Sequence, residues 1–203
     1  MRTFKAVVLQ LTVGLLVVGC NDSLTDAELP GTAGLEPATV VVTTRPVVVI
    51  GVGTVVGEAT ITRNANGATA NVQTTGLTPG NIYSLWWVVF GNPEECTGPC
   101  DATDLLDPDV NGGATQVGAH VVGGSGQAAY GARLNLVDPL PTGNTLGNTF
   151  DDVLGSEFHL VVRNHGPALT GQQQAEQLSE FNGGCPPNTC ANAQVSMHAA
   201  AAP

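Results

Sequence analysis

Lysine is almost missing from this chain of 203 residues, which has six lysines and arginines together against seventeen aspartates and glutamates. A surface so poor in cations cannot neutralise phosphate groups, which disfavours nucleic acids and anionic lipid headgroups as partners. Charged residues of both signs make up only 11% of the chain, too few to indicate adaptation to high salt.

The common catalytic signatures are missing too. The sequence has no Gly-x-Ser-x-Gly elbow, Walker loop, dinucleotide-binding fingerprint or HExxH motif. Nothing marks a pair of carboxylates for glycoside hydrolysis. The sequence therefore gives no positive indication of an enzyme.

The N-terminal residues have the pattern of an export signal. A largely apolar run of thirteen residues, Ala6–Val18, follows Arg2 and Lys5. That length suits a signal peptide and falls short of the roughly 20 residues of a spanning helix. Residues 17–20 (Val-Val-Gly-Cys) resemble the lipobox of bacterial lipoproteins. The resemblance implies lipidation of Cys20; the alternative is an ordinary signal peptide followed by an incidental cysteine.

The lipobox resemblance also implies a cellular location and a domain organisation. Residues 1–19 are then a signal peptide, and acyl chains hold the protein to a membrane of the cell envelope. Asn21, in place of aspartate, implies the outer membrane in a Gram-negative host. The aperiodic residues 20–38 are expected to form a lipidated, flexible tether before a single domain at 39–203. Without its leader the chain has four arginines and seventeen acids, a formal charge of −13.

Short β-branched runs separated by turn residues follow the predicted tether, which favours strands over helices. Asn64-Ala-Asn-Gly67, between two alternating segments, predicts a hairpin. We predict strands at residues 40–44, 47–56, 58–63, 68–74, 82–90, 115–122, 127–136, 157–163 and 194–199. This pattern predicts an all-β fold, an antiparallel β-sandwich with long loops.

One short helix is predicted at residues 171–181. Thr170 and Gln173 have the spacing of a capping box, and Gly183-Gly184 would end the helix. Its apolar face would consist of Ala175, Leu178 and Phe181.

The segment Gly76-Leu-Thr-Pro-Gly-Asn-Ile-Tyr83 resembles a stretch of fibronectin-type-III and related sandwiches. In those folds the tyrosine hydroxyl bonds back to the chain, so the resemblance implies an immunoglobulin- or fibronectin-III-like architecture. Residues 76–96 together with 157–167 also resemble a group of exported bacterial and archaeal proteins of unassigned function. That resemblance implies a stable secreted domain and transfers no activity.

The predicted strand at 82–90 is apolar on both faces. Its inward set would be Leu85, Trp87 and Val89, and Trp86 would lie on the opposite face with Ser84, Val88 and Phe90. Such a strand is expected to be central and covered on both sides. Alternatively, one tryptophan is exposed as a platform for a surface glycan or a protein ligand.

Four cysteines remain once Cys20 is assigned to lipid. In an exported protein the expectation is two disulfides, for which we favour the local pairs Cys96 with Cys100 and Cys185 with Cys190. The alternative is a four-cysteine zinc site.

Three histidines are candidates for a copper or zinc site. Alternation places His159 on the face opposite Phe158. His120 and His159 would meet on adjacent strands, with His165 at the rim, and three imidazoles suit copper or zinc. The alternative is that all three are hydrogen-bonded histidines of the sheet.

An acidic loop is a candidate for calcium. Asp107, Asp109 and Asn111, followed by Gly112, match the first half of an EF-hand loop. Position twelve would be Gly118 rather than glutamate, so the closing bidentate carboxylate is missing. The alternative is a solvated acidic loop held by a disulfide. Altogether the sequence predicts a lipid-anchored β-sandwich with a structural or ligand-binding role, or else a metal-binding protein.

Overall fold

The computed structural model describes residues 38–135, 145–147 and 152–201. The predicted signal peptide, the lipidation site at Cys20 and the tether up to residue 37 lie outside the described residues. The chain from Ala38 onward forms one compact unit. Within the described ranges, no helix combines the length and the apolar character that crossing a bilayer requires.

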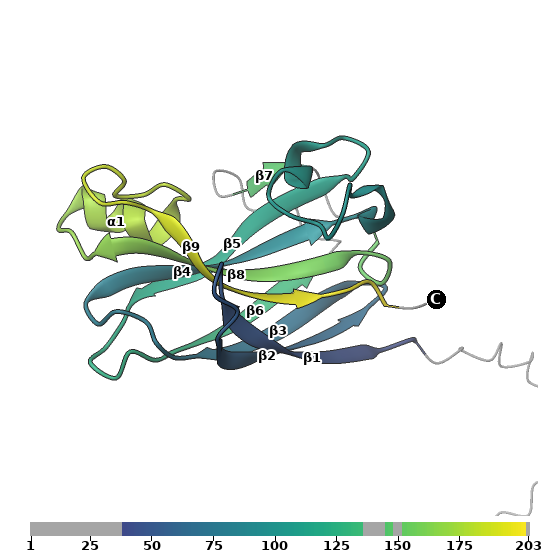
Figure 1. Cartoon of the computed structure of the whole chain (residues 1–203), viewed down its shortest axis with the longest axis horizontal. Coiled ribbons are helices and arrows are strands. Elements are labelled where there is room, and N and C mark those ends of the chain that lie inside the picture. Colours follow the sequence, from purple (N-terminus) through teal and green to yellow (C-terminus); the bar gives the residue numbers. More distant parts are fainter. Residues whose placement is uncertain (1–37, 136–144, 148–151, 202–203) are drawn as a thin grey trace, which may run out of the picture. The chain divides into compact units, whose positions relative to one another are not determined.

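The described part of the chain is mostly β-structure with one short α-helix, α1 (Gln172–Ser179), as predicted (Figure 1). Two single turns of 3-10 helix, η1 (Pro93–Glu95) and η2 (Asp104–Leu106), interrupt the acidic loop. The strands are β1 (Val41–Val49), β2 (Val55–Asn64), β3 (Gly67–Thr74), β4 (Asn81–Phe90), β5 (Gly112–Val121), β6 (Ala128–Asn135), β7 (Thr145–Gly147), β8 (Glu157–Pro167) and β9 (Ala191–His198).

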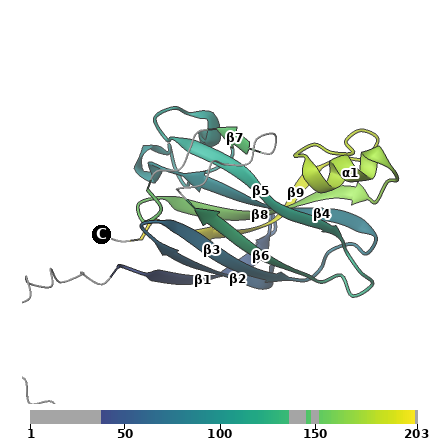
Figure 2. The same ribbon diagram turned by 180° about the vertical axis from the view of Figure 1, so that it is seen from behind.

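All these strands belong to one antiparallel sheet, in the order β6-β3-β2-β1-β9-β8-β4-β5-β7. The sequence predicted a sandwich of two sheets, whereas here the two halves stay joined through β1 and β9. The junction is narrow, with only Val48 paired to Val195 and Val49 paired to Gln194. Figures 1 and 2, from opposite sides, show the sheet curling like half of a barrel, with β1, β2, β3 and β6 beneath β4, β5 and β8.

The main hydrophobic core fills the concave side of the curled sheet. Trp87 lies there, edge-on to Phe158 at 5.5 Å between ring centroids. Arg63 is fully buried at the margin of this core and donates to the carbonyls of Ser156 and Ala199. Burial lowers the pKa of Arg63. The other buried residues include Val47, Ala59, Ile61, Ala70, Val72, Tyr83, Leu85, Val89, Tyr130, Leu134, Leu160 and Val162.

Two local sequence predictions are confirmed. Strands β2 and β3 form a hairpin in which Asn64 pairs with Gly67. The hydroxyl of Tyr83 accepts a hydrogen bond from the backbone N–H of Thr78 at 3.2 Å, so the side chain bonds back to the preceding turn. Both features depend on residues close in sequence, which is why a short motif could predict them.

Strand boundaries near the start of the domain differ from the prediction. Strand β1 runs without a break through Arg45 and Pro46, and the chain turns only after Val49. The turn contains Gly51 and Gly53, both with positive φ, which β-branched neighbours rarely adopt. The predicted strand at 47–56 is therefore divided between β1 and β2.

Helix α1 forms where predicted, but a different interaction holds it. Its N-cap is Gly171, with no side-chain cap, so the predicted capping box of Thr170 and Gln173 does not form. The buried helical residue is Gln177. Its carboxamide accepts from the N–H of Leu169 and donates to the carbonyls of His165 and Pro167.

Both predicted disulfides are present. Cys96 is bonded to Cys100 in the acidic loop, and Cys185 to Cys190 in the loop between α1 and β9. Each bond closes a small ring, so each fixes the shape of one loop rather than joining distant elements.

Candidate functional site: an apolar groove on the outer face

The convex face of four neighbouring strands carries a second apolar surface. Strand register aligns Trp86 on β4 with Val161 on β8 and Val195 on β9. The next row, two residues along each strand, is Val88, His159 and Met197. Because side chains alternate between faces, both rows point away from the main core.

Two disulfide-bonded loops rise on either side of these rows and turn the surface into a groove. The acidic loop contributes Leu105, and the loop after α1 contributes Phe181. Phe181 meets Trp86 edge-on, with ring centroids 5.1 Å apart. We call this cavity the outer groove; it is lined by Ile50, Trp86, Val88, Phe90, Cys100, Asp101, Ala102, Leu105, Ala114, Leu146, His159, Val161, Phe181, Asn192, Val195 and Met197.

The outer groove has the size and chemistry of a small-molecule site. Its volume is about 330 Å³, near the lower end of the roughly 300–1,000 Å³ typical of ligand pockets. Its floor is buried, with Trp86 only 1% exposed, whereas its mouth has large apolar side chains open to solvent. Ile50, Leu146 and Met197 at the mouth are 43%, 40% and 51% exposed.

A buried relay of hydrogen bonds holds Trp86 in the floor. The indole N–H donates to Ser84 Oγ at 2.8 Å, and Ser84 Oγ lies 2.7 Å from His165 Nε2. His165 Nδ1 lies 3.1 Å from the carbonyl oxygen of Gly183, which makes Nδ1 the donor and leaves Nε2 to accept from the serine. Burial is the main cause of the lowered pKa of His165.

The hydrogen bond between Ser84 and His165 resembles that between a catalytic serine and its general base, but no substrate can reach it. Ser84 and His165 are both fully buried. Neither side chain lines the outer groove or either of two further cavities, which lie over β2, β3 and β6. The pair therefore acts as a support for Trp86 and for the loop that carries Gly183.

Arg163 fixes the wall formed by Phe181. Its guanidinium carbon lies 3.8 Å from the centre of the Phe181 ring. The same guanidinium donates to the Phe181 carbonyl and to the side-chain oxygens of Asn182 and Asn192. The contacts with Phe181 and Asn182 join β8 to the loop that follows α1, and the bond to Asn192 joins β8 to β9, so the wall is held in place from the sheet.

The three histidines predicted as copper or zinc ligands do not come together. His120 on β5 pairs with Tyr83 and His159 on β8 pairs with Val88, so β4 lies between the two histidine strands. His159 Nε2 is 2.7 Å from Glu157, and the His120 ring packs on Tyr130. His165 was expected at the rim but is fully buried. Among the described residues, no group of three or more His, Cys, Asp or Glu side chains is placed to hold a metal.

The predicted calcium residues form a turn. Asp107 Oδ1 accepts from the backbone N–H of Asp109 at 2.9 Å, and Asn111 adopts a left-handed φ of 54°. Both aspartates are exposed. The four paired cysteines likewise form disulfides rather than the alternative zinc site.

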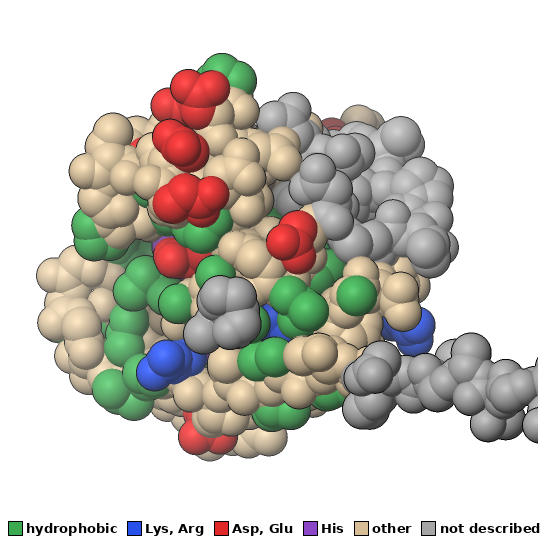
Figure 3. Space-filling model, turned by 90° about the vertical axis from the view of Figure 1, so that its right-hand side faces the viewer, with side chains coloured by type: hydrophobic (Ala, Val, Ile, Leu, Met, Phe, Trp, Pro, Cys, Tyr) green, Lys and Arg blue, Asp and Glu red, His purple; other side chains and the backbone are tan. Residues whose placement is uncertain are grey.

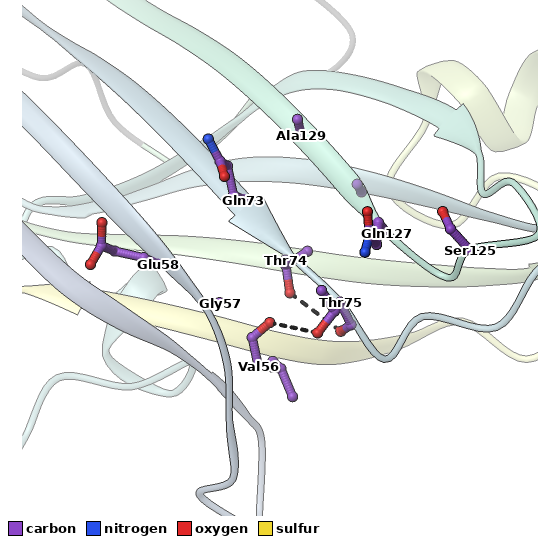
Figure 4. A pocket seen from close by; sticks show the side chains of 10 residues that line it. Val56, Gly57, Glu58, Gln73, Thr74, Thr75, Ser125, Gln127 and Ala129 are labelled. Atoms are coloured by element: carbon purple, nitrogen blue, oxygen red, sulfur yellow. Dashed lines mark hydrogen bonds between the residues drawn. The ribbon is translucent and has the colours of Figure 1, made fainter.

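A larger cavity, of about 650 Å³, lies over β2, β3 and the start of β6. Figure 4 shows its polar side chains spread along neighbouring strands rather than converging on one point. Thr75 Oγ1 already donates to the Val56 carbonyl, and Thr74 Oγ1 donates to Gln194. No aromatic side chain lines this cavity, so the outer groove is the better candidate site.

Sequence reasoning missed the groove although it assigned its faces correctly. Alternation placed Trp86, Val88 and Phe90 on one face of their strand, and His159 on the face opposite Phe158. Both assignments are confirmed. The missing information was that β4 and β8 are neighbours, which no local pattern specifies. Neither tryptophan is an exposed platform, since Trp86 and Trp87 are each 1% exposed.

Comparison of the chain with protein-family models, with curated proteins and with solved structures gave no match.

Proposed function

We propose that this chain is an exported lipoprotein, tethered through Cys20, whose β domain binds a small and mainly apolar ligand in the outer groove. The observation that carries the binding role is the groove itself. Its aromatic floor is Trp86, and its walls are two loops, each with a disulfide, one of which contributes Phe181. A pre-formed site of this kind loses little entropy when a ligand enters.

Two features support the proposed address. The sequence around Cys20 has the basic residues, apolar run and lipobox of a lipoprotein. Two local disulfides fit a protein that folds in an oxidising compartment, because cytosolic thiols are kept reduced. In this proposal the tether carries the domain above a membrane of the envelope, the outer one in a Gram-negative host.

We also propose that the curled sheet is a variant of the immunoglobulin- or fibronectin-III-like sandwich whose halves remain joined. The hydrogen bond from Thr78 to Tyr83 supports this comparison. An experimental structure with β1 paired to β9 along its whole length would contradict it.

The binding role can be tested with water-soluble, fluorine-labelled compounds that contain one aromatic ring. Fluorine NMR would follow their line widths with the full-length chain in lipid nanodiscs, with empty nanodiscs as the blank. We expect broadening by the wild-type chain and none by Ala102→Trp, because Ala102 is exposed and lines the groove, where an indole would fill the space.

The matched control is Ala129→Trp, which places the same side chain in the larger, polar cavity. Ala129 is also exposed, so both substitutions leave the main core untouched. Binding that survives Ala102→Trp and disappears in Ala129→Trp would move the site to the polar cavity. Failure of every compound to bind the wild-type chain would refute the proposal.

A further inference from the structure

We propose that the ligand of the outer groove is a cation, a primary or quaternary ammonium compound with one aromatic or branched apolar group. This inference rests on the proposed binding role and names the ligand class. The size of the apolar group follows from the cavity. At about 330 Å³, the groove has roughly twice the volume of an apolar cavity of about 150 Å³ that accepts benzene.

The carboxylate of Asp101 supplies the negative charge. Asp101 lines the groove beside the buried Cys100. Its Oδ1 accepts two hydrogen bonds of 2.7 Å from Thr103, one from the backbone N–H and one from the hydroxyl. Both hydrogen bonds from Thr103 end on Oδ1 rather than on Oδ2. The backbone and side-chain bonds from Thr103 lower the pKa of Asp101, so the carboxylate is ionised at neutral pH.

His159 adds a second acceptor when its imidazole is neutral. Nε2 then donates to Glu157 at 2.7 Å, so the lone pair lies on Nδ1. Nδ1 makes no hydrogen bond to any described residue, and the ring lines the groove against Phe90, 5.0 Å away between centroids. A primary ammonium group carries three donors and no acceptor, so it complements both acceptors, whereas a quaternary ammonium has no N–H and is attracted by the charge of Asp101 alone.

No basic side chain of the described residues lines the groove. The described residues contain four arginines and no lysine, and none of the four lines the groove. Arg45 and Arg133 are exposed elsewhere, and Arg63 is buried in the main core. Arg163 contacts the wall, but its nitrogens are all bonded to Phe181, Asn182 and Asn192.

The net charge of the molecule also favours a cationic ligand. Figure 3 shows acidic side chains gathered in one area on one side of a band of hydrophobic side chains, with basic side chains beside the same band on its other side. With seventeen acids against six basic residues, the field of the whole chain attracts cations.

The test compares three compounds of matched shape: 4-fluorophenethylammonium, 4-fluorophenethyl alcohol and 3-(4-fluorophenyl)propanoate. Dissociation constants would be measured by fluorine NMR with the full-length chain in nanodiscs of neutral phosphatidylcholine. We expect the ammonium compound to bind roughly 5-fold more tightly than the alcohol, and the propanoate to bind most weakly. Raising the salt concentration should reduce the preference for the cation.

Asp101→Asn should remove that preference by weakening binding of the ammonium compound roughly 5-fold while leaving the alcohol unchanged. Asp107→Asn is the matched control, because Asp107 is an exposed acid of the same loop that does not line the groove. Equal affinities for the ammonium compound and the alcohol, with both lost in Ala102→Trp, would overturn the charge inference and leave the binding role standing. If none of the three compounds bound, the binding role itself would fail.

Discussion

Trp86 and Trp87 show how much one position along a strand changes the role of a residue. The two indoles have the same exposure, but Trp87 belongs to the main core and Trp86 to the floor of the outer groove. Trp86 Nε1 donates to Ser84, whereas Trp87 Nε1 has no partner among the described residues. The residue with the satisfied polar atom is the one at the candidate site, where a fixed ring position matters.

His198 is one of two buried histidines, with His165, whose lowered pKa makes stability depend on pH. It is fully buried, with Thr43 Oγ1 2.8 Å from Nδ1 and Ser196 Oγ 3.1 Å from Nε2. Burial first, then the charges of Arg63 and Arg45, with a smaller effect of His159, lower its pKa to about 4. The imidazole of His198 is therefore neutral in the folded state at neutral pH.

We predict that the free energy of unfolding falls between pH 6.5 and pH 4. In that window the unfolded chain binds a proton at His198 and the folded chain does not, so stability present above pH 6.5 is lost on acidification. The expected loss is on the order of 2–3 kcal/mol. Urea unfolding at pH 7 and pH 4.5 would measure it. His198→Gln should flatten the pH dependence, and an unchanged slope would contradict the assignment to this histidine.

At the scale of elements, helix α1 is held by one buried carboxamide rather than by an apolar face. Ala175 and Leu178, predicted to face the core, are exposed. Gln177 takes that role because the chain before the helix presents one free N–H and two carbonyls to it. Asn188 bonds the same two carbonyls, so the N–H of Leu169 depends on Gln177 most.

We therefore predict that Gln177→Leu lowers the free energy of unfolding by about 2–3 kcal/mol, since a donor is left without its partner in a buried place. Urea unfolding followed by tryptophan fluorescence would measure the change. Gln173→Leu is the matched control on the exposed side of the helix and should stay within about 0.5 kcal/mol of wild type. Equal stability of both variants would show that Gln177 does not anchor the helix.

What the sequence could predict about the elements follows from the range of the interactions. The hairpin at Asn64–Gly67, the Tyr83 bond and the two disulfides join residues at most five apart, and all were predicted. The burial of the strand at 82–90 on both faces was predicted from its composition.

Features that depend on long-range pairing were not predictable. The single sheet depends on two residue pairs between β1 and β9, and the outer groove depends on the register of β4, β8 and β9. The histidine site failed for the same reason, because alternation gives the face of His159 but not the strand beside it. The helix face failed because Gln177 is polar, and its burial follows from backbone groups outside the helix.

At the scale of the whole molecule, the proposed lipid anchor and the acidic domain would have opposite effects on binding to a membrane. A lipid on Cys20 would hold the chain at a bilayer, whereas a net charge of −11 for the full sequence repels anionic headgroups. In the proposed lipoprotein, the acyl chains on Cys20 would therefore supply the membrane affinity.

We predict that Cys20→Ser abolishes incorporation of labelled palmitate and reduces the share of the protein in the membrane fraction. The physical reason is that acyl chains gain about 0.8 kcal/mol for each buried CH₂, which no surface of this acidic domain replaces. Metabolic labelling and fractionation of cells would measure both effects. A wild-type chain without label would instead identify an ordinary signal peptide followed by an incidental cysteine.

The place of β9 has a consequence for the order in which the molecule can assemble. This strand is the last in the described chain, but it lies in the middle of the sheet, between β1 and β8. Until it arrives, the β6-β3-β2-β1 ribbon and the β8-β4-β5-β7 ribbon share no backbone ladder. When the amino end emerges first, the two ribbons therefore form before they are joined. The sheet becomes continuous only when β9 pairs with both β1 and β8.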